Sequence, residues 1–127
     1  MNILICTECP LLRQLIEDVL PDRSLNLFYV RNDSSMEHTL RNSLIDAVFI
    51  KVSAKHRAAS LEKLGLIRKW ASSVQIICFA EDATPRFAAE CGQLGADVVN
   101  SSRLSLEGLR IITGRIFVSA QDECYTC

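Results

Sequence analysis

The sequence has little of what marks a membrane, secreted or nucleic-acid-binding protein. Its 127 residues contain no apolar run approaching the ~20 residues that a membrane-spanning helix needs. The opening MNILIC has neither the basic segment nor the small-residue cleavage site of a secretory signal. With 14 Lys and Arg against 15 Asp and Glu, the formal net charge is −1, so the basic field that nucleic-acid binders carry is missing. We therefore expect a cytoplasmic protein that binds neither membranes nor nucleic acid directly.

Residue groups that would mark an enzyme are also missing. The sequence has no Gly-rich phosphate loop, no Ser/His/Asp set and no carboxylate pair at catalytic spacing. Its two histidines, His38 and His56, stand alone and are expected at the surface. We predict that the protein is not an enzyme and that it holds no metal or other cofactor.

What is present is the composition of one ordinary domain, with 49% apolar and 23% charged residues. The strand-like apolar runs are continuous rather than alternating, which is typical of strands that are covered on both faces. The clearest runs are Ile3–Cys6, Ala47–Ile50 and Val74–Phe79, and the weaker ones are Leu25–Val30 and Asp97–Asn100. The pattern predicts the strands of a parallel sheet.

Five segments with helical spacing lie between and after these runs. The best marked starts at Thr84, an N-cap followed by a proline, and ends before Gly95. Ser34 with Glu37 three residues later forms a capping-box pattern. The predicted helices cover about residues 10–20, 34–43, 60–71 and 85–94, and a last one that Ser105 caps.

Alternating strands and helices predict an α/β fold with one doubly wound, five-stranded parallel sheet and flanking helices. We expect this domain to span residues 1–120, followed by a C-terminal tail at 121–127. Because right-handed crossovers bring the carboxyl ends of the strands to one edge, residues after the first, third, fourth and fifth strands should form any site.

Over about residues 2–119 the sequence resembles the receiver domain of two-component response regulators. The likeness lies in five segments. ILICTECPLLRQLIEDVL is similar to the family's ILIVDDEPLLRELLxxxL, DAVFIKVS to DLVLLDLxMP, IICFAED to IIxLTAxx, GADVVNSS to GADDYLTKP, and SLEGLR opens the last helix. The resemblance implies the chemotaxis-regulator-like fold with strand order 2-1-3-4-5.

The resemblance also implies which residues stand at the family's phosphorylation site. That chemistry needs an acidic pair after the first strand, an acceptor aspartate after the third, a hydroxyl after the fourth and a lysine after the fifth. The corresponding residues here are Thr7 and Glu8, Lys51, Ala80 and Ser102. A primary ammonium cannot form an acyl phosphate, and its charge lies where Mg²⁺ belongs. We therefore predict a degenerate pseudo-receiver that binds no Mg²⁺ and is not phosphorylated.

An ammonium at the edge of the sheet calls for a negative partner. We hypothesise a contact between Lys51 and Glu8, with Glu81 after the fourth strand as a second carboxylate within reach. The remaining alternative is that Lys51 points into water.

The six cysteines include two CxxC pairs. Cys6 and Cys78 lie in apolar runs, where buried free thiols are common. Cys9 lies at a predicted helix start, where a thiol pKa is lowered, so a thiol-based redox sensor using Cys6 and Cys9 is the alternative function. The second pair, Cys124–Cys127, is expected at the opposite edge of the sheet, which disfavours a shared zinc site.

The predicted last helix carries two apolar stripes. Ile111 and Val118 lie seven residues apart and away from the face that should pack on the sheet. Such a stripe marks an association surface or a pair of scattered surface residues. The preferred interpretation is a regulatory protein–protein interaction or dimerisation module of bacterial signal transduction, which binds a second copy or a signalling partner through this helix.

Overall fold

The computed structural model describes residues 2–7, 10–19 and 26–100. Its strands are β1 (Asn2–Cys6), β2 (Asn26–Tyr29), β3 (Ala47–Lys51), β4 (Gln75–Ala80) and β5 (Ala96–Asn100). Its helices are α1 (Pro10–Val19), α2 (Asp33–Asn42), α3 (Arg57–Trp70) and α4 (Pro85–Gln93), with a 3-10 turn, η1 (Ala54–His56), before α3. The predicted last helix, the domain boundary at residue 120 and the tail lie outside the described residues.

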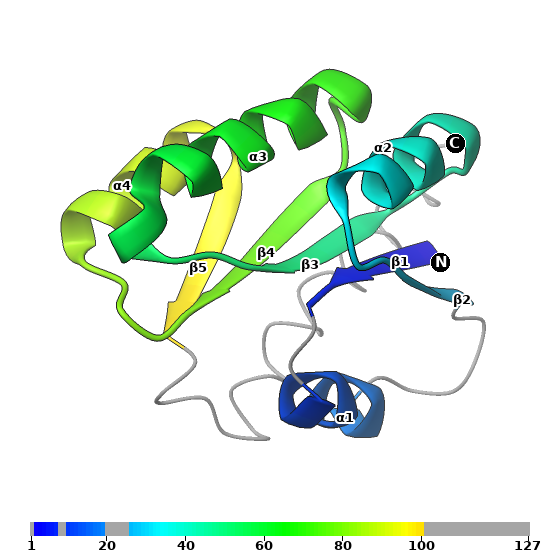
Figure 1. Ribbon diagram of the computed structural model, residues 1–127, viewed down its shortest axis with the longest axis horizontal. Coiled ribbons are helices and arrows are strands. Elements are labelled where there is room, and N and C mark those ends of the chain that lie inside the picture. The colour runs from blue at the N-terminus through cyan, green and yellow to red at the C-terminus, as the bar shows by residue number, and fades with distance from the viewer. Residues whose placement is uncertain (1, 8–9, 20–25, 101–127) are drawn as a thin grey trace, which may run out of the picture.

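The five strands form one sheet in the order β2-β1-β3-β4-β5, and every neighbouring pair is parallel. Helices α2, α3 and α4 cover one face of this sheet, and α1 lies on the other face (Figure 1). The predicted doubly wound parallel sheet and its strand order are therefore confirmed.

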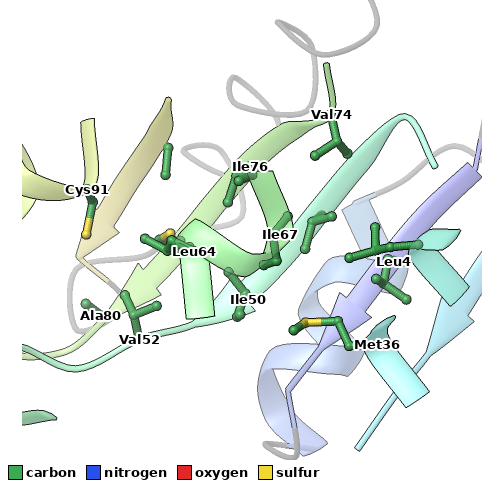
Figure 2. Close-up of a cluster of buried hydrophobic side chains, with 14 of the residues drawn as sticks. Leu4, Met36, Ile50, Val52, Leu64, Ile67, Val74, Ile76, Ala80 and Cys91 are labelled. Carbon is green, nitrogen blue, oxygen red and sulfur yellow. The ribbon is translucent and has the colours of Figure 1, made fainter. Parts of the chain in front are cut away.

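The continuous apolar runs are explained by the helices on both faces of the sheet, which bury strand residues that point in either direction. Ile3, Leu4 and Ile5 are consecutive residues of β1, and none of them is exposed to solvent. Alternate strand residues such as Leu4, Ile50 and Ile76 pack with Met36 of α2 and Leu64 of α3 in one apolar cluster (Figure 2). Burial of apolar surface contributes about 25 cal/mol per Å² to the free energy of folding.

The starts of two helices differ from the sequence prediction. The capping box at Ser34 and Glu37 is wrong, because α2 is capped by Asn32, whose side chain accepts a hydrogen bond from the backbone N–H of Ser35 at 2.8 Å. Helix α3 begins at Arg57 rather than near residue 60, since Ser53 starts the 3-10 turn that leads into it. Both missed caps are polar residues that act earlier in the chain.

The start and end of α4 agree with the prediction. Thr84 caps the helix by accepting a hydrogen bond from the backbone N–H of Phe87 at 3.2 Å, and Gly95 has a positive φ of 75°. The guanidinium of Arg68 then joins α3 to this turn by donating to the carbonyls of Leu94 at 2.7 Å and Gly95 at 2.8 Å.

Strand register places the candidate site residues. Cys6 is paired with Ile50, Lys51 with Phe79 and Ala80 with Asn100, so the carboxyl ends of β1, β3, β4 and β5 meet at one edge.

Among the helices described, none has both the length and the apolar character to cross a membrane.

Candidate functional site at the carboxyl edge of the sheet

A cavity of about 680 Å³ lies at the carboxyl edge of the sheet, against α2 and α3. Its volume is within the range of about 300–1,000 Å³ that small-molecule sites occupy. Buried apolar side chains of Val30, Met36 and Val52 line its interior. Six charged or titratable residues also line it, namely Cys6, Arg31, Asp33, Lys51, His56 and Lys63.

The sequence predicted only part of this site. Thr7 after β1 and Lys51 at the end of β3 do line the cavity, as expected for residues that follow these strands. The segment after β2, from Val30 to Asp33, also lines it and was missed. It was missed because the prediction considered only the residues after the first, third, fourth and fifth strands, whereas α2 begins soon after β2 and its first residue, Asp33, lies at the cavity.

Lys51 has a carboxylate partner, but a loosely held one. Its Nζ lies 4.0 Å from Oε1 of Glu81, and the side chains are 45% and 70% exposed. An exposed pair at this separation contributes about 0–1 kcal/mol. Glu81 is one of the two carboxylates considered from the sequence, whereas Glu8, the hypothesised partner, lies outside the described residues.

The other positions that the resemblance assigns to the phosphorylation site include Thr7, Ala80 and Ser102. Thr7 is buried, and its backbone carbonyl accepts a hydrogen bond from Nε of Arg13 at 2.7 Å. Ala80 is completely buried and has no hydroxyl. Ser102 lies outside the described residues. A hydroxyl and an ammonium in place of carboxylates do not fit Mg²⁺, which prefers negatively charged oxygen ligands. Within the described residues no three His, Cys, Asp or Glu side chains form a metal-binding group.

An aspartate that the sequence analysis did not single out holds the loop after β3. Asp82 Oδ1 accepts from the backbone N–H of Ala54 at 2.9 Å, and Oδ2 accepts from the hydroxyl of Ser53 at 2.9 Å and the backbone N–H of Lys55 at 3.0 Å. The hydrogen bonds from Ala54 and Lys55 lower the pKa of the carboxyl to about 2. The one sequence signal for this loop-binding role is the position of Asp82, two residues after the end of β4.

A second ion pair joins α2 to α3 at the cavity. Nζ of Lys63 lies 3.3 Å from Oδ1 of Asp33, and both side chains are partly exposed. The thiol of Cys6, at the end of β1, also lines the cavity. Burial raises its pKa to about 12, although the charge of Lys63 acts in the opposite direction.

The free thiols therefore differ from what a redox site needs. Cys78 is buried as predicted, Cys6 is only half-buried, and Cys91 is buried in α4. The raised pKa of Cys6 disfavours the thiolate, which is the reactive form. Cys9 and the pair Cys124–Cys127 lie outside the described residues.

Comparison with known proteins shows the fold but no close relative. The sequence matches no protein-family model and no curated protein. Its structure is similar to a response regulator of Thermotoga maritima, with a TM-score of 0.77 and 18% identity over 91% of this chain and 95% of the other. It is also similar to an orphan response regulator of H. pylori, with a TM-score of 0.72 and 19% identity over 93% and 94%.

A third similar structure is that of an atypical orphan response regulator with a phosphorylation-independent regulatory mechanism. Its TM-score is 0.68, at 20% identity over 87% of this chain and 90% of the other. At these identities the likeness shows that the chain has the receiver fold of response regulators.

Proposed function

We propose that this chain is a non-phosphorylatable pseudo-receiver that acts as a regulatory protein–protein interaction or dimerisation module in bacterial two-component signalling, and that it is not an enzyme. The observation that carries the proposal is Lys51 at the end of β3, the position that the resemblance assigns to the acceptor aspartate. An amine at this position offers no carboxylate for an acyl phosphate.

Two further observations support a site that works without phosphate. Ala80 cannot bond a phosphoryl oxygen through a hydroxyl, so no side chain at the end of β4 reports on the modification. The loop after β3 is held by hydrogen bonds to the carboxylate of Asp82, a side chain of the protein itself. The similar orphan regulator that works independently of phosphorylation indicates that the receiver fold is compatible with such a role.

The phosphorylation test compares the natural chain with a reconstructed one. The natural chain is incubated with acetyl phosphate and Mg²⁺, and its mass is then measured by mass spectrometry. We expect no stable phosphoryl adduct. The variant Thr7→Asp, Lys51→Asp, Ala80→Thr and Ser102→Lys is the positive control, because it restores the residues that the family uses. A stable aspartyl phosphate on the natural chain would overturn the proposal.

The output surface is a separate part of the proposal. We propose that residues 1–120 form the domain and that Ile111 and Val118, on the last helix predicted from the sequence, bind a second copy or a signalling partner. Ile111→Glu or Val118→Glu should lower the sedimentation coefficient of the protein or abolish partner binding, since each places a charge in an apolar contact. Lys69→Glu, on an exposed position of α3, is the control. Unchanged association of both variants would contradict this surface.

The environment of Cys6 gives the redox alternative less support than the pseudo-receiver proposal has. A sensor that uses Cys6 and Cys9 needs an accessible thiolate, whereas burial raises the pKa of Cys6 to about 12. Reversible oxidation of the natural chain by peroxide, with loss of two free thiols in the first CxxC pair, would restore this alternative.

A further inference from the structure

We propose that the cavity against α2 and α3 is a binding site for a small organic anion, one with an apolar body and a phosphate or carboxylate group. This goes beyond the proposed function, which requires no ligand. Three properties of the cavity support it: the balance of charge on its lining, the groups available to bind an anion, and its apolar interior.

The first property is charge. Among the described residues that line the cavity, Arg31, Lys51 and Lys63 are cationic and only Asp33 is acidic, so three positive charges face one negative charge. The whole chain, in contrast, has a formal net charge of −1. The positive potential is therefore local to the cavity and not a property of the surface in general, and a cleft of one sign concentrates ligands of the opposite sign.

The second property is that the cationic groups are incompletely paired. Lys63 is neutralised by Asp33 at 3.3 Å, whereas Lys51 lies 4.0 Å from an exposed carboxylate. Among the described residues, no ion pair or hydrogen bond joins the guanidinium of Arg31 to another residue. A ligand anion could therefore be bound by Lys51 and Arg31 without breaking a tight internal pair. Hydrogen bonds between such cations and a phosphate or carboxylate are the stronger, charge-assisted kind.

The third property is the interior, which favours an organic ligand over a bare ion. Val30, Met36 and Val52 are each at most 7% exposed in the folded chain and line the cavity together with Ala59. The buried hydroxyl of Ser60 already donates to the carbonyl of Ser53 at 3.2 Å and accepts from its N–H at 3.1 Å. The interior thus provides apolar contact, and the hydroxyl of Ser60 is already hydrogen-bonded, as expected beneath the body of an organic anion.

The chemistry also argues against a cation as the ligand. Asp33 is the only carboxylate among the described residues that line the cavity, and its Oδ1 is taken by Lys63. The cavity volume of about 680 Å³ suits a small molecule better than a peptide or protein segment.

The experiment titrates the natural chain with phenyl phosphate, benzoate and benzyl alcohol and follows its amide and methyl resonances by NMR. Phenyl phosphate and benzoate combine an aromatic body with the two candidate anionic groups, and benzyl alcohol is a neutral analogue. We expect saturable shifts at Arg31, Val52 and Met36 with at least one of the anions. Benzyl alcohol should bind about tenfold more weakly, because it lacks the charge-assisted hydrogen bonds.

Variants then assign the charge. Lys51→Gln and Arg31→Gln should each weaken binding of the anion by about tenfold, whereas Lys69→Gln, which removes the same charge from an exposed position on α3, should change it by less than about twofold. Both cavity residues are exposed, so the two variants should fold, and either one alone tests the charge.

The inference is overturned by saturation without preference for the anions, by shifts centred away from the cavity, or by no saturable binding of either anion. These outcomes leave the proposed function intact, because it is tested by phosphorylation. Conversely, an aspartyl phosphate on the natural chain would overturn the proposed function without affecting the titration.

Discussion

The backbone N–H of Ala54 donates a hydrogen bond of 2.9 Å to the carboxylate of Asp82, and this bond ties the loop after β3 to the loop after β4. Ser53 and Lys55 donate to the same carboxylate. One side chain thereby closes the edge of the sheet beside Lys51 and holds the 3-10 turn η1 that leads into α3.

This arrangement predicts an acid-sensitive loop. The pKa of Asp82 is lowered from 3.8 to about 2, so its contribution to the free energy of unfolding is complete above pH 3.8 and is lost as the pH falls toward 2. Asp82→Asn should speed amide hydrogen exchange at Ala54 and Lys55 at neutral pH and remove this part of the acid dependence. Asp97→Asn, an exposed carboxylate on β5, should leave exchange at both amides unchanged. Equal exchange in the natural chain and Asp82→Asn would contradict the assignment.

The two glycines near the end of α4 give opposite predictions. A Cβ on Gly95 would lie 2.7 Å from Nη2 of Arg68, and its φ of 75° disfavours any side chain. Gly95→Ala should therefore lower the free energy of unfolding by at least about 1–2 kcal/mol in a urea titration. Gly92→Ala is the matched control, because a Cβ there meets nothing within 4 Å and lies in a helix. It should raise the stability by up to about 1 kcal/mol. A Gly95→Ala variant as stable as Gly92→Ala would be inconsistent with this turn.

The pair of Lys51 and Glu81 should matter little to stability. Its partners are 4.0 Å apart and substantially exposed, so a double-mutant cycle with Lys51→Gln and Glu81→Gln should give a coupling energy below about 1 kcal/mol, decreasing in high salt. Urea titrations of the four proteins measure it. A larger, salt-insensitive coupling would show that Lys51 is held much more tightly than this distance indicates.

The thiols provide a prediction about reactivity. Burial raises the pKa values of Cys6, Cys78 and Cys91, so all three should react slowly with iodoacetamide at neutral pH in the folded chain. Peptide mapping by mass spectrometry gives the rate at each cysteine, and the urea-unfolded chain provides the uninhibited rates. Rapid labelling of Cys6 in the folded chain would argue against its raised pKa and in favour of the redox alternative.

The comparison of α4 with α2 shows why some elements were predicted more accurately than others. Thr84, Pro85 and Gly95 are local signals whose conformational preferences act within one helix, and they agree with the structure. At α2, however, Asn32 and Ser34 are both acceptable caps, and Asn32 is the residue that has the extended backbone a cap needs. That choice depends on where β2 ends, which local sequence does not determine.

The order of strands and helices, the apolar faces and the place of Lys51 at the end of the third strand follow from the amino-acid sequence alone, because periodicity, caps and residue chemistry act over a few neighbouring positions. The partners of Lys51 and Asp82 and the gathering of Arg31 with Lys63 around one cavity are decided only by tertiary structure. These groups are separated by tens of residues in the chain, and parallel pairing with its crossovers brings them to a common edge.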